Sequence, residues 1–580
     1  MKISSEESPS VIDRFLNLIE SASSSDRFLL RIAFFAVIST VIWLAFSLNQ
    51  EYSENTPTRG GSFTEGIIGT PRFINPVLAL TRADQDVTAL VYSGLMKISS
   101  DGTLVNDVAE SIELSNDGLT YDVKLRTDLK FHDYTPLTAK DVIYTLRLIQ
   151  DPDLKSPLRG NWTNVSIVEV GDYELKIIIK EAYAPFIENF TIGIMPAHLW
   201  SSLPIDQLPF SQLNTEPIGS GSFSVVSAKR DASGLINHYT LNAFRENSTD
   251  PKINTIELAF YQNEELLLMA IDKKEIEATT YISPEKLGGV VSSNYRLIEK
   301  PLPRNFAIFF NQNRNAALRD KAAREALTIS LNRDELIKNA LHGHGVPIYG
   351  PTAILQPELE SKDSTNDTEN GTPTERAESI LEEANWVKNS AGLWEKKIDK
   401  EPVTLSITLR TSNAPLFEEL VKAIAKQWKA IGVEVTTEQF EQTGLVQSVI
   451  RPRDFEALLF GLDMNRSYDL YPFWHSSQQN DPGLNIAQYA NVKVDELLTT
   501  ARTEQSEPDR LKALSEASKI ITAESPAIYL FQPAFTYLVS DKITVTEMQN
   551  IGRPADRFSN VDEWHTESDT LWPIFRNKEM

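Results

Sequence analysis

The chain has no cysteine, and its 580 residues contain only 56 Lys and Arg against 80 Asp and Glu. Without cysteine there is no disulfide framework, no cysteine-ligated zinc or iron–sulfur site and no thiol nucleophile. The formal net charge of −24 repels phosphate backbones and no basic patch interrupts it, so nucleic-acid binding is not expected. Hydrophobic residues make up 41% of the chain, which suits a folded protein but not a multi-span membrane protein. At roughly 100 to 200 residues per domain, two or more packed lobes are expected.

Long apolar runs are also scarce, and the one exception is residues 28–48, FLLRIAFFAVISTVIWLAFSL. After Arg31 this run carries no charge, and as a helix that part alone would span about 25 Å. We therefore predict one transmembrane helix at 28–48. A buried core helix is the less suitable interpretation, because such a helix should show a polar face and this run has none.

The charges beside this helix predict its orientation. Arg14, Arg27 and Arg31 lie on its N-terminal side, whereas only Arg59 lies close on the other side. Basic residues favour the cytoplasmic side, so we predict a cytoplasmic tail at 1–27, a linker at 49–61 and an extracytoplasmic remainder. A cleaved signal peptide is the main alternative, although its apolar part is usually shorter, and the small-residue exit Ala45-Phe46-Ser47 is a poor cleavage site.

The rest of the chain interleaves strand and helix patterns. Residues 112–125 read as a hairpin around Asn-Asp-Gly, and Thr138 to Asp141 form a capping box before a helix at 142–149. Residues 403–435 read as strand, amphipathic helix and strand, which predicts a parallel βαβ unit. Short apolar runs at 306–310 and 455–460 predict buried strands, and a further short strand is predicted at 527–530. The fold class that these patterns favour is α/β with two lobes.

No catalytic motif stands out. Nucleophile-elbow, P-loop, metalloprotease and dinucleotide-binding signatures are all missing, and Gly219-Ser220-Gly221 is better interpreted as a tight turn. His342 and His344 lie between turn glycines, which favours a loop over a metal site. We predict no enzyme activity, no cofactor and no metal. Because carboxylates are abundant, a secreted hydrolase with paired carboxylates stays open as the alternative from another class.

Short motifs follow one another in a fixed order from about residue 61 onward. They include Tyr92-Ser93-Gly94-Leu95, Phe131-His132-Asp133, Pro217-Ile218-Gly219-Ser220-Gly221, Arg324-Glu325-Ala326-Leu327 and Tyr489-Ala490-Asn491-Val492. In content and order they resemble the bacterial extracellular solute-binding proteins of family 5, the peptide-binding subunits of ABC importers. Two departures from that family are visible. Its usual glycine after His-Asp is Tyr134 here, and its usual lipoprotein cysteine is missing.

The resemblance implies a periplasmic-binding-protein-like clamshell of type II with an extra subdomain. Residues 62–300 would form lobe I, 301–525 lobe II, and 526–580 a segment that returns to lobe I. It also implies a monomeric receptor, membrane-anchored outside the cytoplasm, that binds short peptides and delivers them to an ABC permease and its ATPase subunits. A binder of a metal chelate or another small solute, and a receptor that has lost transport, remain alternatives.

The resemblance also suggests candidate ligand-binding residues. A peptide needs its charged ends paired in the cleft, because an unpaired buried charge costs several kcal/mol. For the ammonium, Asp463 is the first choice and Asp469 the second, and for the carboxylate Arg410 is the candidate. Tyr471, Phe473 and Trp474 are candidates for side-chain pockets. Ligand length and side-chain preference are not accessible from the sequence.

Overall fold

The computed structural model describes residues 23–247, 250–291, 294–352, 371–547 and 549–571. It divides into two units: Met1–Thr58 with Glu567–Met580, and Arg59–Thr566. Most of the predicted cytoplasmic tail, residues 1–22, lies outside the described residues.

The first unit contains the apolar run as a single helix, α2 (Ser24–Tyr52), whose N-cap Ser23 accepts a hydrogen bond from the Asp26 amide. An 18-residue window of this helix has a mean hydropathy of 2.2, and none of its residues is buried. By length and composition the helix is able to cross a membrane.

The predicted linker at 49–61 has more regular structure than expected. Helix α2 continues to Tyr52, and β1 (Glu54–Pro57) pairs antiparallel with β23 (Ser568–Leu571) from the other end of the chain. This pairing could not be predicted, because strand partners more than five hundred residues apart leave no local pattern.

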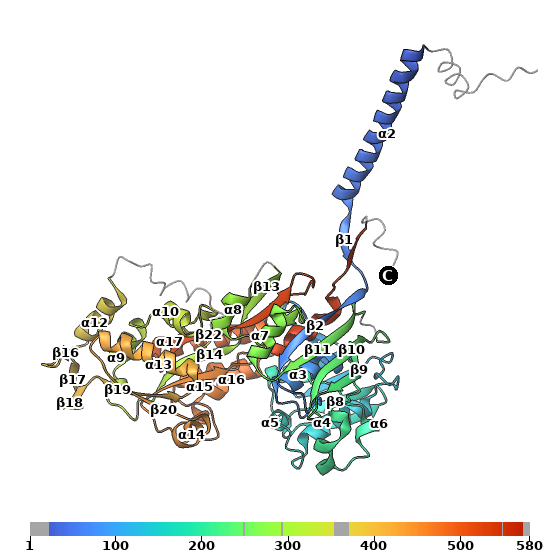
Figure 1. The fold of residues 1–580 in the computed structure, drawn as a ribbon. Coiled ribbons are helices and arrows are strands. Elements are labelled where there is room, and N and C mark those ends of the chain that lie inside the picture. The colour runs from blue at the N-terminus through green and yellow to red at the C-terminus, as the bar shows by residue number, and fades with distance from the viewer. Residues whose placement is uncertain (1–22, 248–249, 292–293, 353–370, 548, 572–580) are drawn as a thin grey trace, which may run out of the picture. The chain divides into compact units, whose positions relative to one another are not determined.

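In the second unit a long strand, β22 (Ala527–Ser540), joins two sheets (Figure 1). Its first part, Ala527–Phe531, pairs with β14 (Arg304–Phe310), and its last part pairs with β13 (Tyr295–Pro301) and β12 (Ala278–Thr279). The sequence predicted only a short strand at 527–530. The strand runs on because the residues up to Ser540 are almost all buried and both sheets supply partners.

One of these sheets is built from the N-terminal part of the second unit. Strand β2 (Gly60–Ile68) lies parallel to β11 (Ile253–Tyr261) and β12, and β10 (Ile236–Ala243) and β9 (Phe223–Arg230) continue the sheet antiparallel. Its core contains Phe63 and Ile67 together with Tyr537, Phe558 and Trp564 from the end of the chain. Residues near both ends of the second unit thus share one core, as a C-terminal segment returning to lobe I would require.

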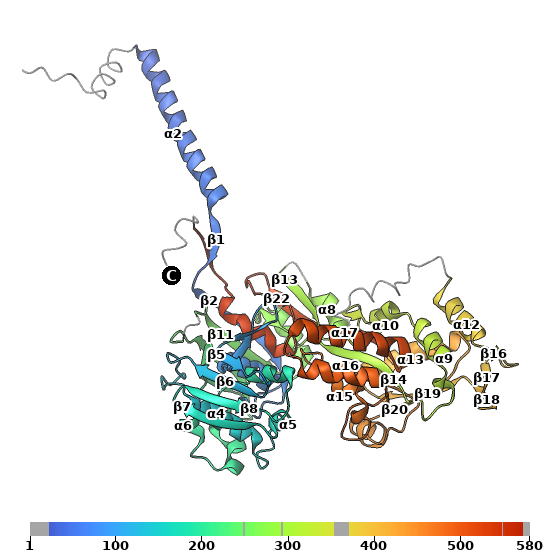
Figure 2. The same ribbon diagram turned by 180° about the vertical axis from the view of Figure 1, so that it is seen from behind.

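The other sheet contains the predicted βαβ unit. Strand β19 (Ser406–Ser412) lies parallel to β20 (Glu434–Phe440), and α13 (Pro415–Ala430) connects them with Leu420, Ile424 and Trp428 buried, so this prediction is confirmed. Strand β21 (Ala457–Asp463) lies between β19 and β14. Helices α16 (Val492–Thr503) and α17 (Glu507–Glu524) pack side by side against this sheet, as both ribbon views show (Figures 1 and 2).

A separate four-stranded sheet confirms the hairpin predicted at 112–125. It has the order β5 (Ala109–Leu114), β6 (Thr120–Leu125), β8 (Glu174–Ile178) and β7 (Ser166–Gly171). Helix α4 (Ala139–Gln150) packs on it and begins with the predicted Thr138–Asp141 capping box. The remaining elements are α3 (Arg82–Val91), β3 (Met96–Ile98), β4 (Leu104–Asn106), α5 (Arg159–Trp162), η1 (Ala184–Thr191), α6 (Ala197–Trp200), η2 (Ile205–Phe210), η3 (Gln212–Asn214), α7 (Glu264–Asp272), α8 (Pro284–Val290), η4 (Ala317–Arg319), α9 (Lys321–Ile329), α10 (Arg333–Ala340), β15 (Gly345–Pro347), α12 (Pro373–Glu383), β16 (Val387–Lys388), β17 (Trp394–Ile398), β18 (Glu401–Thr404), α14 (Gln442–Leu445), η7 (Val446–Ile450), α15 (Tyr471–Trp474), η8 (Ser476–Gln478) and η9 (Pro554–Glu563).

Two positions in the sequence motifs lie in tight turns of the backbone. Tyr134, where the family has glycine, adopts a φ of +67° and its amide donates to the Phe131 carbonyl at 2.8 Å, so the turn is kept. At Gly219 an added Cβ would lie 2.0 Å from the Val91 carbonyl oxygen, which explains why this turn needs a residue without a side chain.

Candidate functional site

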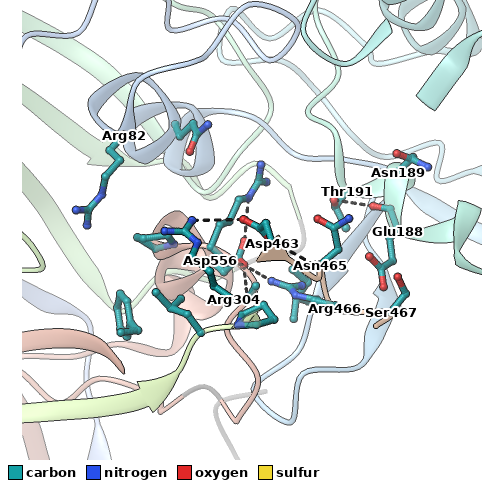
Figure 3. Close-up of a pocket in the computed structure, with 18 of the residues that line it drawn as sticks. Arg82, Glu188, Asn189, Thr191, Arg304, Asp463, Asn465, Arg466, Ser467 and Asp556 are labelled. Carbon is teal, nitrogen blue, oxygen red and sulfur yellow. Dashed lines mark hydrogen bonds and ion pairs between the residues drawn. The ribbon is translucent and has the colours of Figure 1, made fainter. Parts of the chain in front are cut away.

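A cavity of about 730 Å³ in the second unit is lined by residues of both sheets and of the segment after β22, and we call it the interlobe pocket (Figure 3). Its volume is in the range of small-ligand sites. Charged side chains contribute much of the lining: Arg82, Glu188, Arg304, Asp463, Arg466, Arg553 and Asp556.

Most of these charges are already paired with one another. The Arg304 Nη2 lies 3.4 Å from Asp463 Oδ2, and both side chains are about half exposed. The buried Asp556 carboxylate accepts hydrogen bonds from Arg466 Nη2, from Arg553 Nε at 3.1 Å and from the Arg553 amide at 2.7 Å. Asp556 is therefore fully engaged inside the protein, whereas Asp463 pairs with an exposed arginine and accepts one hydrogen bond from the Asn465 amide at 3.3 Å.

Arg82, at the start of α3, is held only by neutral partners. Its Nη2 donates to the Thr280 hydroxyl at 2.5 Å and to the Thr280 carbonyl at 3.3 Å, and its guanidinium lies 4.2 Å from the ring centre of Tyr281. Within the described ranges its side chain forms no ion pair. The stacked and hydrogen-bonded guanidinium is thus fixed in place with its charge unneutralised by direct contact.

Glu188, on η1, is the complementary case on the other side of the pocket (Figure 3). Among the residues that the structure describes, its carboxylate makes no hydrogen bond or ion pair. Burial raises its pKa to about 7, and the cations of Arg466 and Arg510 only partly oppose this effect. Among the described residues that line the pocket, one carboxyl group and one guanidinium therefore lack a directly bound partner of opposite charge.

Next to Arg82 lies a buried ionic network. The Arg557 guanidinium donates to Glu65 at 2.9 and 3.1 Å and to Asp86 at 2.8 Å through two of its nitrogens. Tyr537 donates to Glu65 at 2.8 Å and Tyr281 to Asp86 at 3.0 Å. Burial raises the pKa of Glu65 although Arg557 opposes the shift. This network fixes Tyr281, the ring on which Arg82 is stacked.

The structure separates the two predicted aspartates. Asp463, at the end of β21, lies in the lining of the interlobe pocket. Asp469 is buried and its Oδ2 accepts from Arg502 at 2.8 and 3.0 Å and from the Tyr183 hydroxyl at 3.2 Å. The partners of Asp469 already satisfy its carboxylate. Asp469 connects the start of η1 to α16, and it is not among the residues that line the pocket.

The other predicted residues lie outside the pocket lining. Arg410 donates to Glu438 at 2.7 Å and to Asp454, so a ligand carboxylate would have to displace a protein carboxylate. Trp474 is 1% exposed and belongs to the hydrophobic core beside β14, and Phe473 packs against the same core. Tyr471 stacks on His475 and lies under the Arg502 guanidinium. Phe473 and Trp474 lie outside the pocket lining because the short helix α15 turns its large apolar side chains toward β14 and β22.

Sequence reasoning did not identify Arg82 or Glu188. Neither belongs to a motif, and each comes from a different part of the chain, so only the folded structure brings them to one cavity. Among the described residues, no group of three or more His, Cys, Asp or Glu side chains is placed to hold a metal ion.

Comparison with known proteins agrees with this α/β architecture. Residues 103–482 match the family "Bacterial extracellular solute-binding proteins, family 5 Middle", and the chain belongs to this family. It is 28% identical over 502 residues to the oligopeptide-binding protein AppA of Bacillus subtilis, covering 83% of this chain and 88% of that protein. The structure of that protein in complex with a nonapeptide has a TM-score of 0.60 at 26% identity, covering 88% of this chain and 100% of the other.

A more distant structure shares the fold. NikZ from Campylobacter jejuni in complex with Ni(L-His) has a TM-score of 0.62 at 22% identity, covering 87% of this chain and 99% of the other. The chain is thus a substrate-binding protein of the ABC-transporter type with the family 5 fold, it is extracytoplasmic, and it is not an enzyme.

Proposed function

We propose that this protein binds short peptides in the interlobe pocket and delivers them to an ABC permease and its ATPase subunits. The observation that carries the proposal is a cavity of about 730 Å³ whose lining holds both an accessible carboxylate, Asp463, and an unneutralised guanidinium, Arg82. A zwitterionic peptide needs one partner of each sign to enter a pocket without leaving a charge unpaired. The oligopeptide-binding relative AppA supports the choice of a peptide as ligand.

Within this proposal Asp463 binds the peptide ammonium. Its present partner Arg304 is half exposed and lies at 3.4 Å, so an ammonium can approach the carboxylate without breaking a strong internal pair. Arg82 is a better candidate than Arg410 for a peptide carboxylate, because it lines the pocket and, in the described part of the chain, forms no ion pair that a ligand would have to displace. Asp469, Tyr471, Phe473 and Trp474 support the fold around the pocket and make no direct contact with the peptide.

The first test is a thermal-shift screen of the full-length chain in mild detergent with a library of di- to octapeptides. A ligand at 100 times its dissociation constant stabilises the folded state by about 2.7 kcal/mol, so the melting temperature should rise clearly with the right peptides. N-acetylated, amidated versions of the same peptides serve as controls and should shift it less. Shifts with a nickel–histidine chelate but with no peptide would favour the chelate-binding alternative and contradict the proposal.

We also propose that α2 is retained as a membrane anchor, with its N-terminus in the cytoplasm. The chain has no cysteine that could carry a lipid, and α2 is 29 residues long with a mean hydropathy of 2.2 in its most apolar window. Signal-peptide apolar regions are shorter, at about 7 to 15 residues. A retained helix would keep the binding protein close to its permease.

The anchor is tested by expressing the full chain with an affinity tag at each end. We expect both tags to remain on one polypeptide of full mass that stays in the membrane after alkaline carbonate extraction, because a spanning helix is not removed by pH or salt. A peripheral membrane protein is the extraction control. A soluble product that has lost the N-terminal tag would show that the helix is a cleaved signal.

A further inference from the structure

We propose that Glu188 selects peptides with a cationic side chain, lysine or arginine, by pairing with it at the η1 wall of the interlobe pocket. This inference rests on the proposed peptide-binding function and adds a side-chain preference to it. The geometry is that of a carboxylate placed in the pocket lining and left without a hydrogen-bond or ion-pair partner within the described part of the chain.

The cations nearest to Glu188 are already engaged elsewhere. Arg466 pairs with the buried Asp556, and Arg510 Nη1 donates to the Ser467 carbonyl at 3.1 Å while its Nη2 lies 3.9 Å from Glu507. Neither guanidinium makes a direct contact with Glu188. Figure 3 shows the Glu188 side chain on the side of the pocket where Arg466 and Ser467 also lie. The protein thus places a carboxylate at this wall and leaves its counter-charge to come from outside.

Charges of both signs face Glu188 from the surrounding elements. Arg466 and Arg510 favour its ionised form, whereas Asp556 and Asp469 disfavour it, and the Tyr183 hydroxyl lies nearby with its own pKa raised by burial. Burial, which these charges only partly modify, raises the Glu188 pKa to about 7, so near neutral pH the carboxylate is only partly ionised without a ligand. An ammonium or guanidinium beside it would favour full ionisation, and the two groups would stabilise each other.

Other ligand groups fit this wall less well. A carboxylate would repel Glu188 and its neighbours Asp556 and Asp469. An apolar side chain would remove the remaining water from Glu188 without replacing its hydrogen bonds, which costs free energy. A cationic side chain long enough to reach the wall is the group that satisfies the carboxylate.

The experiment compares pentaalanine with variants that carry a single Lys or a single Gln at each position in turn. Binding to the full-length chain in mild detergent is measured by calorimetry for wild type, for Glu188→Gln and for the matched control Glu181→Gln. Glu181 is exposed just before η1 and outside the pocket lining. At one position or more, we expect wild type and the control to bind the Lys peptide about tenfold more tightly than the Gln peptide, and Glu188→Gln to lose this preference.

A pH series supplies a second measurement that a merely structural role would not change. In wild type the Lys-to-Gln affinity ratio should fall by about tenfold from pH 7.5 to 5.5, because Glu188 must be ionised to pair with lysine. In Glu188→Gln the ratio should not change with pH, and an unchanged melting temperature would show that this variant is folded.

The possible failures are distinguishable. If wild type binds none of these peptides and none of the wider library, the proposed peptide-binding function is wrong and this inference fails with it. If the peptides bind but the Lys preference is missing, or is the same in Glu188→Gln, the inference is wrong while the proposed function stands.

Discussion

Replacing Arg557 with Met should lower the free energy of unfolding by about 3–5 kcal/mol, the usual cost of leaving buried charges without their partner. Arg557 is 2% exposed, and the Glu65 and Asp86 carboxylates that it joins are 0% and 1% exposed. Without the guanidinium these two carboxylates would remain in the core with only Tyr537 and Tyr281 as donors. Urea denaturation of the full chain in detergent measures the loss.

The matched control is Arg553→Met, at the N-cap of η9, the element that contains Arg557. Arg553 also pairs with an aspartate but its side chain is 55% exposed, so this change should cost less than about 1 kcal/mol. Adding Glu65→Gln and Asp86→Asn to Arg557→Met should recover part of the stability, because removing all the buried charges together is far less costly than removing one. Equal losses for Arg557→Met and Arg553→Met would contradict this account.

The loss should also depend on pH in a defined direction. Burial raises the pKa of Glu65 above its ordinary value, and removing Arg557 removes a cation that opposes this shift. The folded state then holds its proton at a pH where the unfolded state has released it, so stability falls as pH rises between the two pKa values. The Arg557→Met variant should therefore lose less stability at pH 5 than at pH 8.

Replacing Asp463 with Asn should weaken the binding of peptides with a free N-terminus by about 10- to 100-fold, the usual effect of losing a charge-assisted hydrogen bond. The carboxylate lies in the pocket lining, and Arg304 would remain there as an unopposed cation that repels the ammonium. Calorimetry with a peptide from the thermal-shift screen, and with its N-acetylated form, provides the measurement. The N-acetylated peptide should bind the wild type and the variant with similar affinity.

A matched control for this variant is Asp399→Asn. Asp399 is also an exposed aspartate with an arginine partner, Arg319 at 3.2 Å, but it does not line the pocket. Neither substitution should change stability by more than about 1 kcal/mol, because both ion pairs are exposed. Unchanged affinity of Asp463→Asn for peptides with a free N-terminus would show that the ammonium binds elsewhere, and would favour the chelate or small-solute alternative.

Elements with a strong local signal could be predicted from the sequence. The Thr138–Asp141 capping box starts α4 because both reciprocal hydrogen bonds are made within four residues. The βαβ unit of β19, α13 and β20 was predictable because its apolar spacing changes from period two to the helical period and back. The full length of β22 was not predictable, since its second part is a strand only because β13 and β12 are there to pair with it.

The candidate site was predictable only in part. Asp463 could be named because it lies at the end of a buried strand in a segment that resembles the family. Trp474, Phe473 and Arg410 were reasonable candidates by residue type. However, Trp474 and Phe473 pack in the hydrophobic core beside β14, and Arg410 is paired with carboxylates of the protein itself. Arg82 and Glu188 carry no local signal, because their importance lies in the partners they lack, and partners are a property of the folded chain.

The sequence by itself determined the limits of this protein: no cysteine chemistry, one apolar helix near the N-terminus, an acidic α/β chain and its family. Composition and local periodicity suffice for the first three conclusions, because these depend on residue types and on near neighbours, whereas the family is indicated by the resemblance of ordered motifs. Only the tertiary structure decided which charges are neutralised. Arg557 satisfies Glu65 and Asp86 across nearly five hundred residues, while Glu188 and Arg82 line the pocket and form no ion pair with any described residue. Charge pairing depends on distance and burial in space, and neither is encoded in spacing along the chain.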